Sequence, residues 1–361
     1  MEQEIIEEKK PKRYKYVLSI LFMLALLVAT IIVLFNKYDI NNVLSVLKKL
    51  NIWLLLGAVA LIFVYILFEG LAMKIILHAL GINVSVANNF VYSAIDYYFC
   101  AVTPSATGGQ PMVAYYMTKD NVPITQTSLV LLINTALFKI VLLTLSVIAI
   151  IACPQYVFYN WLTITLYFLG FAINVFLIVM CFLGAFKRKW IEAAGKRVIM
   201  LLHKWHIVKK PISTMRIFIQ KMEEYEEGAK LIKYHKKHFA LALLANFIQR
   251  VAMFSMAFFV FVAFKEAYPM LHDSSYIELL SLQVIIALSV DSLPLPGGVG
   301  ISEFLYVLLM GMVYGGEDMV GTAMMVTRSV SFYIPVIITM LIFMGKHLRV
   351  TFRHKREKKI S

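Results

Sequence analysis

The sequence predicts an all-helical protein that crosses a membrane several times. Of its 361 residues, 60% are hydrophobic and only 16% are charged, and the mean hydropathy is +0.77. This balance is far more apolar than that of a soluble globular chain. A helix needs roughly 20 apolar residues to cross about 30 Å of hydrocarbon. Six runs meet this requirement and are expected to be full spans: Tyr16–Phe35, Ile52–Leu77, Thr127–Ala152, Phe158–Phe186, Phe239–Phe264 and Met319–Met344.

The first apolar run follows a basic stretch, Lys9–Lys15, as a secretory signal peptide does. It is too long for a signal peptide, and no small-residue cleavage site follows it, so we expect a retained anchor. Cys100, Cys153 and Cys181 lie in apolar surroundings without metal-ligand spacing. We therefore expect small buried thiols, no disulfide framework, no metal site and no cofactor.

The positions of the cations predict the orientation of the chain in the membrane. The formal net charge is +14, and Lys and Arg cluster in three segments. Residues 187–237 hold 14 Lys and Arg against 5 acids, residues 346–361 hold 7 against 1, and residues 1–15 hold 5 against 4. By the positive-inside rule all three segments face the cytoplasm of a cell-membrane protein, so both termini are cytoplasmic. Anionic lipid, rather than nucleic acid, is the expected partner of these charges.

Two further apolar regions must each enter and leave on one face if the cytoplasmic segments are to stay on one side. These regions are residues 90–116 and 277–314, and Pro and Gly interrupt each in its middle. We interpret them as re-entrant helical hairpins, the first entering from the cytoplasm and the second from outside. The alternative is a pair of kinked ordinary spans, in which the freed backbone must still face protein or water.

Opposed hairpins make the two halves of the chain inverted relatives, a pattern typical of transporters with a midplane binding site. Between the halves, Trp190–Trp205 and Ile212–His238 mix apolar and basic residues at helical spacing, which predicts amphipathic helices on the inner leaflet or, alternatively, a solvated linker. The expected organisation is a tail at 1–15, a membrane half at 16–186, a cytoplasmic segment at 187–238, a second membrane half at 239–345 and a basic tail at 346–361.

The tip of each hairpin is a candidate anion site. A half-helix is expected to begin near Met112 and near Ile301, so that unpaired backbone N–H groups point into the membrane. Glycine lets a phosphate approach that backbone closely, and a low dielectric strengthens the attraction. The candidate phosphate-binding glycines are Gly108 and Gly109 in the first tip and Gly297, Gly298 and Gly300 in the second.

Ionisable residues within apolar spans cost several kcal/mol at the bilayer centre, so each needs a partner or a role. Arg328, Arg250 and Lys139 are the candidate ligands of a lipid phosphate. Glu303, Asp291, Asp96 and Gln110 are candidates for headgroup contact or coupling. For Glu303 and Arg328 the alternative is a structural ion pair that ties the second hairpin to the last span. Glu69 and Lys74 are set aside, because they approach the end of their span and can snorkel.

At the two hairpins the sequence resembles the lysylphosphatidylglycerol synthase transmembrane-region family, which includes the membrane half of the bacterial multiple peptide resistance factor. The resemblance covers roughly residues 16–345 and rests on three motifs, of which the first departs from the family pattern at Gln110, where an acidic residue fits better. The motifs are Thr103-Pro104 through Gly108-Gly109-Gln110-Pro111, Pro294-Leu295-Pro296-Gly297-Gly298-Val299-Gly300-Ile301-Ser302-Glu303, and Arg328-Ser329-Val330-Ser331-Phe332-Tyr333-Ile334-Pro335.

The resemblance implies a flippase-like module that moves an anionic or aminoacylated lipid, such as lysylphosphatidylglycerol, between leaflets, with effects on envelope charge and resistance to cationic antimicrobial peptides. It also implies a homodimer. In full-length relatives a soluble aminoacyl transferase follows the membrane region; here Ser361 lies sixteen residues past the last apolar run, so no transferase domain is expected.

Two rival functions remain. One is a membrane-embedded transferase acting on phosphatidylglycerol or a polyprenyl-phosphate lipid, a phosphatidylglycerol lysyltransferase by family name, with Glu303 or Asp291 as general base. No nucleotide-binding loop or metal-ligand cluster stands out in the sequence, which favours transport over catalysis. The other rival is a scaffold for a separate lipid synthase.

Overall fold

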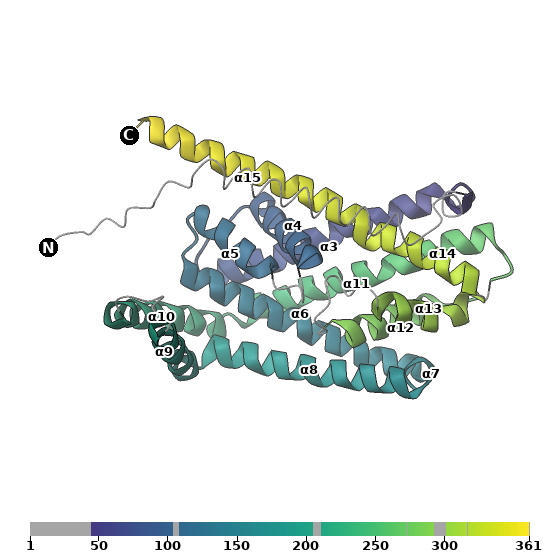
Figure 1. The fold of residues 1–361 in the computed structure, drawn as a ribbon, viewed down its shortest axis with the longest axis horizontal. Helices are drawn as coiled ribbons and strands as arrows, with labels where there is room; N and C mark the ends of the chain where they lie inside the picture. Colours follow the sequence, from purple (N-terminus) through teal and green to yellow (C-terminus); the bar gives the residue numbers. More distant parts are fainter. Residues whose placement is uncertain are drawn as a thin grey trace. The chain divides into compact units, whose positions relative to one another are not determined.

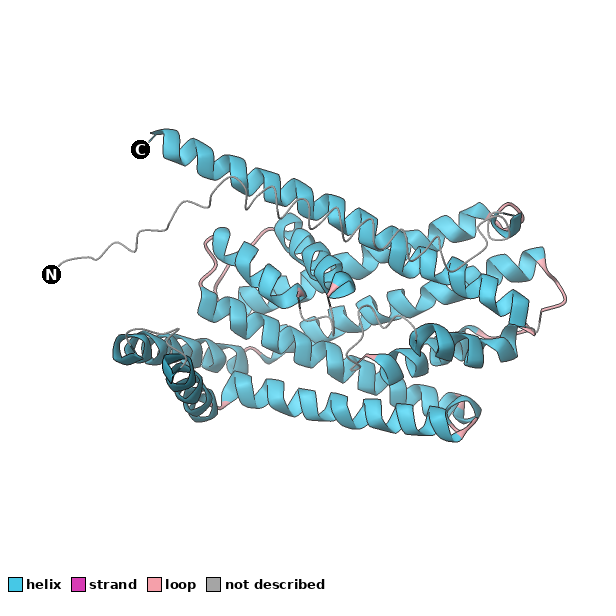
Figure 2. Cartoon of the chain, in the orientation of Figure 1, coloured by secondary structure: helices cyan, strands magenta, loops and turns pink. Residues whose placement is uncertain are grey.

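The computed structural model describes residues 45–103, 108–204, 211–271, 273–291, 301–315 and 317–360. The chain divides into two compact units, residues 1–49 and 50–361, and only residues 45–49 of the first unit are described. Within the described residues all regular structure is helical and no strand occurs (Figure 2). The predicted all-helical class is confirmed for this part of the chain.

The helices of the second unit follow the chain as labelled in Figure 1. The first half holds α3 (Ile52–Ala79), α4 (Val86–Val102), α5 (Gly109–Lys119), α6 (Ile124–Ala152), α7 (Pro154–Val157) and α8 (Trp161–Phe186). Two helices link the halves, α9 (Arg188–Lys204) and α10 (Pro211–Tyr234). The second half holds α11 (Lys236–Ala267), α12 (Tyr276–Val290), α13 (Ile301–Tyr314), α14 (Glu317–Arg328), the π-helix η3 (Ser329–Tyr333) and α15 (Ile334–Ile360).

Five helical segments are long and apolar enough to cross a bilayer, which supports a multi-pass membrane protein. They coincide with five of the six predicted spans, whereas the sixth, Tyr16–Phe35, lies outside the described residues. The five segments are Ile52–Ala79, Ile124–Ala152, Trp161–Leu183, Lys236–Ala267 and Met319–Thr351. The last segment contains η3 and continues into a helix that ends at Ile360, so no break in the helix marks the start of the expected basic tail.

The long helices pack together in a bundle, and the shorter helices pack against them. The most extensive packing joins α3 to α11, and α6 packs against α8 and α12. The α3–α4 and α5–α6 connections lie at the same end of this bundle as α9 and α10 (Figure 1). The α11–α12 connection lies at the opposite end, together with α7 (Figure 1). The helix pair α4–α5 and the helix pair α12–α13 therefore begin from opposite ends of the bundle.

Both short pairs start and pack in the same way. Each first helix begins at a serine N-cap, Ser85 for α4 and Ser275 for α12, whose hydroxyl accepts a backbone N–H at 3.2 Å. Each first helix also lies directly against a glycine of a long helix. A Cβ added to Gly70 of α3 would stand 2.7 Å from the backbone oxygen of Asn89, and one added to Gly170 of α8 would stand 2.3 Å from that of Leu288. Small residues permit such close helix contacts within a membrane bundle.

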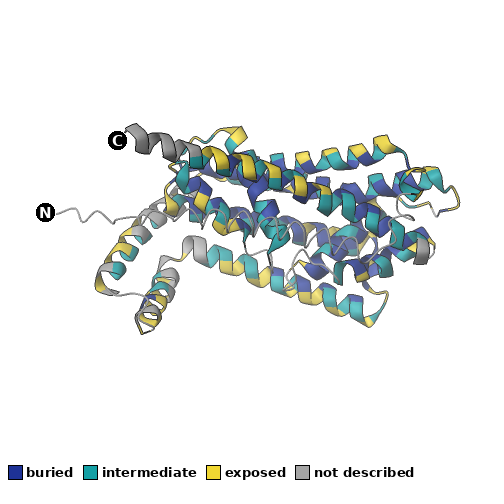
Figure 3. Ribbon diagram, turned by 45° about the horizontal axis from the view of Figure 1, so that its top comes forward, coloured by how far each residue is buried: buried dark blue, intermediate teal, exposed yellow. Residues whose placement is uncertain are grey.

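The burial pattern separates a core from an apolar exterior. Buried residues concentrate where the helices face one another, and exposed residues follow the outer faces of the long helices (Figure 3). The exposed face of α8 is itself apolar, with Phe168, Phe176 and Val179 each at least 48% exposed. Apolar outer faces of this kind suit contact with lipid rather than water. The linking helices α9 and α10 pack against each other and also expose apolar side chains, among them Met200 and Ile217.

Candidate functional site

The end of α12 gathers charged residues from three helices. Asp291, the C-cap of α12, receives a hydrogen bond from Lys139 of α6 in a close ion pair. Arg250 of α11 lies beside the same carboxylate. Its Nη2 atom is 3.9 Å from Asp291 Oδ1. Three of the residues that the sequence singled out therefore meet at one point, although they are far apart in the chain.

Arg250 is the least satisfied member of this group. Arg250 is 7% exposed, and its Nε and Nη2 atoms are buried with no hydrogen-bond partner. The guanidinium carbon lies 3.3 Å from the centre of the Phe138 ring, so the two planar groups are in contact. Arg250 also interacts electrostatically with Tyr65 and Glu69 of α3. A buried cation with free donors is thus held against an aromatic ring between α3, α6 and α12.

A second ion pair joins α13 to the last span. Arg328 Nε lies 3.6 Å from Glu303 Oε1, and Arg328 also donates a hydrogen bond to the hydroxyl of Ser302. Ser302 and Glu303 stand in the first turn of α13, and Arg328 directly precedes η3. The contact expected between Glu303 and Arg328 is present, and it ties the two helices together.

The π-helix after Arg328 connects this region to the first helix pair. Pro335 has no N–H, so an ordinary helix would leave the carbonyl of Ser331 without its usual partner. The hydroxyl of Tyr97, on α4, donates to that carbonyl at 2.7 Å. Tyr97 in turn packs edge-on against Tyr65 of α3, with ring centres 5.6 Å apart. A chain of buried contacts therefore runs from the last span to α4 and α3.

Near the start of α5, the first helix pair has two acids in contact with each other instead of an acid paired with a cation. Glu69 of α3 is 5% exposed and accepts a hydrogen bond from Ser93 Oγ at 2.6 Å. Its carboxyl group lies within hydrogen-bonding distance of the carboxyl group of Asp96, on α4. Asp96 also contacts the start of α5, because a Cβ added to Gly109 would stand 2.3 Å from Asp96 Oδ1. The anion site expected at the N-terminal start of α5 thus already has a carboxylate beside it.

Glu69 is a residue that the sequence reading missed. It lies ten residues before the end of α3, which places it about 15 Å from that end along the helix axis. Its carboxylate is buried and accepts a hydrogen bond from Ser93, so the interpretation as a snorkelling residue is wrong. Counting the rise along the helix would have identified it. Gln110 does not join the acids: its side-chain amide donates to Thr135 Oγ1 at 2.5 Å.

The glycines of the second tip fall on undescribed positions. Gly297, Gly298 and Gly300 lie outside the described residues, whereas Gly108 and Gly109 are described. The backbone N–H of Gly108 donates to Thr103 Oγ1 at 2.9 Å, across the break between α4 and α5. Among the described residues, no group of three or more His, Cys, Asp and Glu side chains could hold a metal ion.

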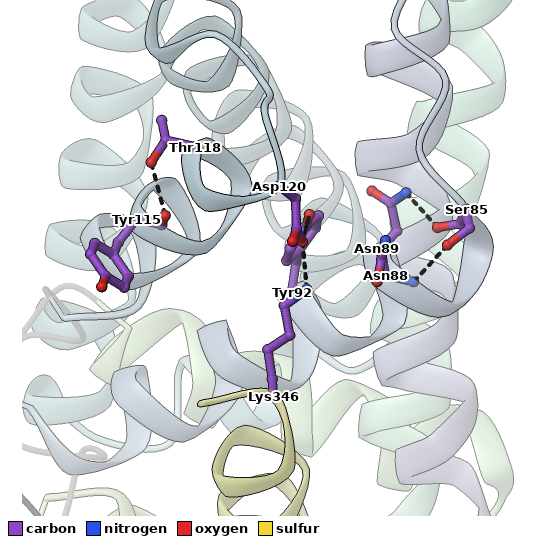
Figure 4. Close-up of polar contacts among 8 residues, drawn as sticks. All are labelled: Ser85, Asn88, Asn89, Tyr92, Tyr115, Thr118, Asp120 and Lys346. Atoms are coloured by element: carbon purple, nitrogen blue, oxygen red, sulfur yellow. Dashed lines mark hydrogen bonds and ion pairs between the residues drawn. The ribbon is translucent and has the colours of Figure 1, made fainter. Parts of the chain in front are cut away.

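Both helix pairs have a tyrosine–carboxylate contact where they open at the end of the bundle. In the first pair Tyr92 donates to Asp120 at 2.5 Å, and Lys346 of α15 contacts the same carboxylate at 2.5 Å (Figure 4). In the second pair Tyr156 of α7 donates to Glu278 in the first turn of α12. Burial and the Glu278 carboxylate raise the pKa of Tyr156 above its usual range, so the phenol stays a donor at neutral pH. The sequence alone did not indicate these contacts, because they join residues that are 28 and 122 positions apart in the chain.

Comparison with known proteins agrees with the resemblance seen at the hairpin motifs. The family model described as "Lysylphosphatidylglycerol synthase TM region" matches residues 16–339. A relative in Mycoplasma pneumoniae, "Uncharacterized protein MG306 homolog", is 23% identical over 383 residues, which cover 96% of this chain and 91% of the relative.

Proposed function

The chain belongs to the lysylphosphatidylglycerol synthase transmembrane-region family, and from this premise we propose that it is a lipid translocase. Its cargo is an anionic or aminoacylated phospholipid that moves between the leaflets of the cell membrane. In this proposal α4–α5 and α12–α13 are re-entrant hairpins that enter from the cytoplasmic and outer faces, in inverted halves of a chain with six spans and cytoplasmic termini.

The observation that carries the proposal is the state of Arg250. A buried hydrogen-bonding group without a partner costs about 1–3 kcal/mol, and Arg250 has two such nitrogens. A phosphodiester oxygen pair matches the planar guanidinium fork and can accept both hydrogen bonds. Phe138 holds the plane of the guanidinium, which fixes the direction from which an anion binds. An anionic headgroup is therefore the ligand that fits these donors.

The neighbouring charges fit the same role. Lys139 adds a second cation, and Asp291 balances the two cations while the site holds no lipid. Because Asp291 stands 3.9 Å from Arg250, an arriving phosphate replaces a loose contact with a close one. We assign the phosphate to this second helix pair, with Gly297, Gly298 and Gly300 as backbone donors, because the start of α5 at Gly108 and Gly109 already faces Asp96.

The remaining candidates serve the other part of the headgroup. Glu303, supported by Arg328 and Ser302, supplies a carboxylate for the cationic end of an aminoacyl group. The acyl chains stay in the bilayer, where the apolar outer faces of the long helices suit them. Moving such a lipid changes the charge of the cell surface, which links the proposed activity to resistance against cationic peptides.

The transferase function receives less support from the same residues. A general base needs a carboxylate that can take a proton from its substrate. Both candidate bases are engaged with cations, Asp291 with Lys139 and Glu303 with Arg328. Each of these carboxylates already has a cation beside the oxygen that a general base would offer to its substrate. A lipid extract that contained a new headgroup only when the protein is present would favour the transferase.

The test is lipid movement in proteoliposomes that contain the full chain. Fluorescent phosphatidylglycerol, lysylphosphatidylglycerol and phosphatidylcholine are compared by chemical quenching of the outer leaflet. We expect the first two lipids to cross faster than phosphatidylcholine. Arg250→Gln is expected to slow them by about 10-fold or more, the equivalent of at least one lost charge-assisted hydrogen bond.

The matched control is Arg349→Gln, the same change at an exposed arginine of α15, which is expected to keep the wild-type rate. Rates equal to those of protein-free vesicles would refute the proposal. An Arg250→Gln variant as fast as the wild type would remove this residue from the mechanism.

A further inference from the structure

One pair of carboxyl groups in the bundle lacks the arrangement that three other acids share, which is a contact with a cation. Asp120 contacts Lys346 at 2.5 Å, Asp291 pairs with Lys139, and Glu303 lies 3.6 Å from Arg328. Glu69 and Asp96 instead lie within hydrogen-bonding distance of each other. The proposed anion site does not use this pair.

The location of the pair is deep in the bundle. Asp96 lies ten residues from the start of α4, and Glu69 lies ten residues from the end of α3. At a rise of about 1.5 Å per residue, both stand about 15 Å along the helix axis from the neighbouring helix ends, a distance of about half the hydrocarbon thickness of a bilayer. The Ser93 hydroxyl donates to Glu69 at this depth.

Asp96 has two hydrogen-bonding neighbours, the carboxyl group of Glu69 and the thiol of Cys100, yet one of its oxygens stands apart from them. Its Oδ1 atom is buried and has no hydrogen-bond partner. This oxygen lies against Gly109, at the N-terminal end of α5, where the helix dipole favours negative charge. A buried acceptor without a donor, next to a second carboxyl group, lacks a proton rather than an anion.

Elementary electrostatics decides the charge of the pair. Two ionised carboxylates in contact within a medium of low dielectric repel each other strongly, so the pair favours binding one proton that the two groups share. A carboxylate pair has acceptors only, and the proton supplies the missing donor. Binding one proton changes the charge of the pair from −2 to −1 and breaks no covalent bond except the one that released the proton.

The groups around the pair are few. The titratable and charged residues that act on it are Tyr65 of α3, Tyr97 and Cys100 of α4 and Arg250 of α11. Arg328 acts on Tyr97, while Lys346 and His347 of α15 contact Tyr92, one turn before Asp96 on α4, and Tyr116 on α5. Arg250 is the cation of this set that interacts with Glu69.

We propose that Glu69 and Asp96 form a proton-binding site whose proton is the coupling ion of lipid movement. This inference rests on the proposed translocase function. Arg250 is shared by the two sites, since it attracts both Glu69 and the lipid phosphate. A phosphate bound to Arg250 reduces its attraction for the ionised pair, so lipid binding favours proton uptake. By linkage, the protonated pair favours lipid binding to the same extent, and the anionic lipid and the proton move together.

The first test reads the proton directly and does not depend on transport. Infrared difference spectroscopy of the full chain in lipid vesicles reports the C=O stretch of a protonated carboxyl group, which shifts in heavy water. At neutral pH we expect this band in the wild type and in Asp273→Asn, a matched control at an exposed acid. We expect the band to be absent from the double variant Glu69→Gln and Asp96→Asn. A wild type without the band would overturn the proton site.

The second test imposes a pH difference across proteoliposomes that contain fluorescent phosphatidylglycerol. One proton per lipid predicts a leaflet ratio of about tenfold per pH unit at equilibrium. Asp96→Asn, which is close in shape and retains a donor for Glu69, is expected to move lipid without responding to the pH difference. A wild type that moves lipid but ignores the pH difference would overturn the coupling. A wild type that moves no lipid would refute the translocase function, and the infrared band would still decide the proton site.

Discussion

The helix pairs α4–α5 and α12–α13 have the same local construction but carry different charges. Each first helix starts at a serine N-cap, packs its backbone against a glycine of a long helix and has a tyrosine–carboxylate contact at its opening. At the inner end, however, the first pair holds Glu69 and Asp96 in contact, whereas the second pair holds Asp291 between Lys139 and Arg250.

This difference separates what the backbone does from what the side chains do. The shared features position two helix ends within the bundle, and they would serve any cargo. In the proposed function the charges set the ligand of each pair. The cationic inner end of the second pair suits an anionic headgroup, and the acidic inner end of the first pair suits a proton. Arg250 interacts with both Asp291 and Glu69, so it is the residue through which the two ends affect each other.

The largest expected effect comes from removing one acid from each pair. Asp291→Asn leaves Lys139 and Arg250 buried without the carboxylate that lies between them, which is expected to lower the free energy of unfolding by about 3–5 kcal/mol. Asp96→Asn relieves a contact between two acids, so its expected loss is below about 1 kcal/mol. Denaturant unfolding in detergent micelles, followed by circular dichroism, measures both. Equal losses would show that the two pairs do not differ in electrostatics.

A smaller effect is expected where the two pairs are alike. Gly70→Ala and Gly170→Ala each place a methyl group within 2.7 Å of a backbone oxygen, and overpacking of this kind costs about 1–3 kcal/mol. Gly311→Ala is the matched control, because no atom lies within 4 Å of its added methyl group. There the better helix propensity of alanine is expected to add up to about 1 kcal/mol. The same unfolding assay applies, and similar results for all three variants would contradict the close contacts.

The smallest expected effects concern the tyrosines at the two openings. Tyr156→Phe and Tyr92→Phe each remove one hydrogen bond, with an expected loss of about 0.5–1.5 kcal/mol. Tyr92→Phe is expected to cost less, because Asp120 keeps its contact with Lys346. The raised pKa of Tyr156 means that its contribution is complete below pH of about 10 and is lost as the pH rises further. Unfolding midpoints at neutral and alkaline pH check this; a Tyr156→Phe variant with an unchanged alkaline loss would contradict it.

Much of the fold could be predicted because apolar length alone defines a span. Proline and glycine likewise indicated that helices end near Val102 and near Val290, since neither residue type continues a helix well. The cost of a charge in hydrocarbon identified Lys139, Arg250, Asp291, Glu303 and Arg328 as residues that need partners. Which residues pair with which depends on how α6, α11 and α12 pack, and periodicity does not contain that information.

The misses have physical reasons of the same kind. Glu69 was judged by its nearness to the end of a span, but ten residues of helix lie between it and that end. Asp120 and Lys346 fell outside the predicted spans, although they form an ion pair whose side chains are at most 17% exposed. The rise along the helix is enough to predict that Glu69 lies deep in its span. The Asp120–Lys346 contact cannot be predicted in this way, because it depends on how α5 packs against α15.

The central claim is that the two short helix pairs open to opposite faces of the membrane. The direct test labels single cysteines with a membrane-impermeant thiol reagent in vesicles of known orientation, after replacement of Cys100, Cys153 and Cys181. Ala87→Cys stands at the exposed start of α4, and Met270→Cys, at a residue 99% exposed, stands between α11 and α12. We predict that Ala87→Cys is labelled only from the cytoplasmic side and Met270→Cys only from the outer side. Labelling of both cysteines from one side would contradict the claim.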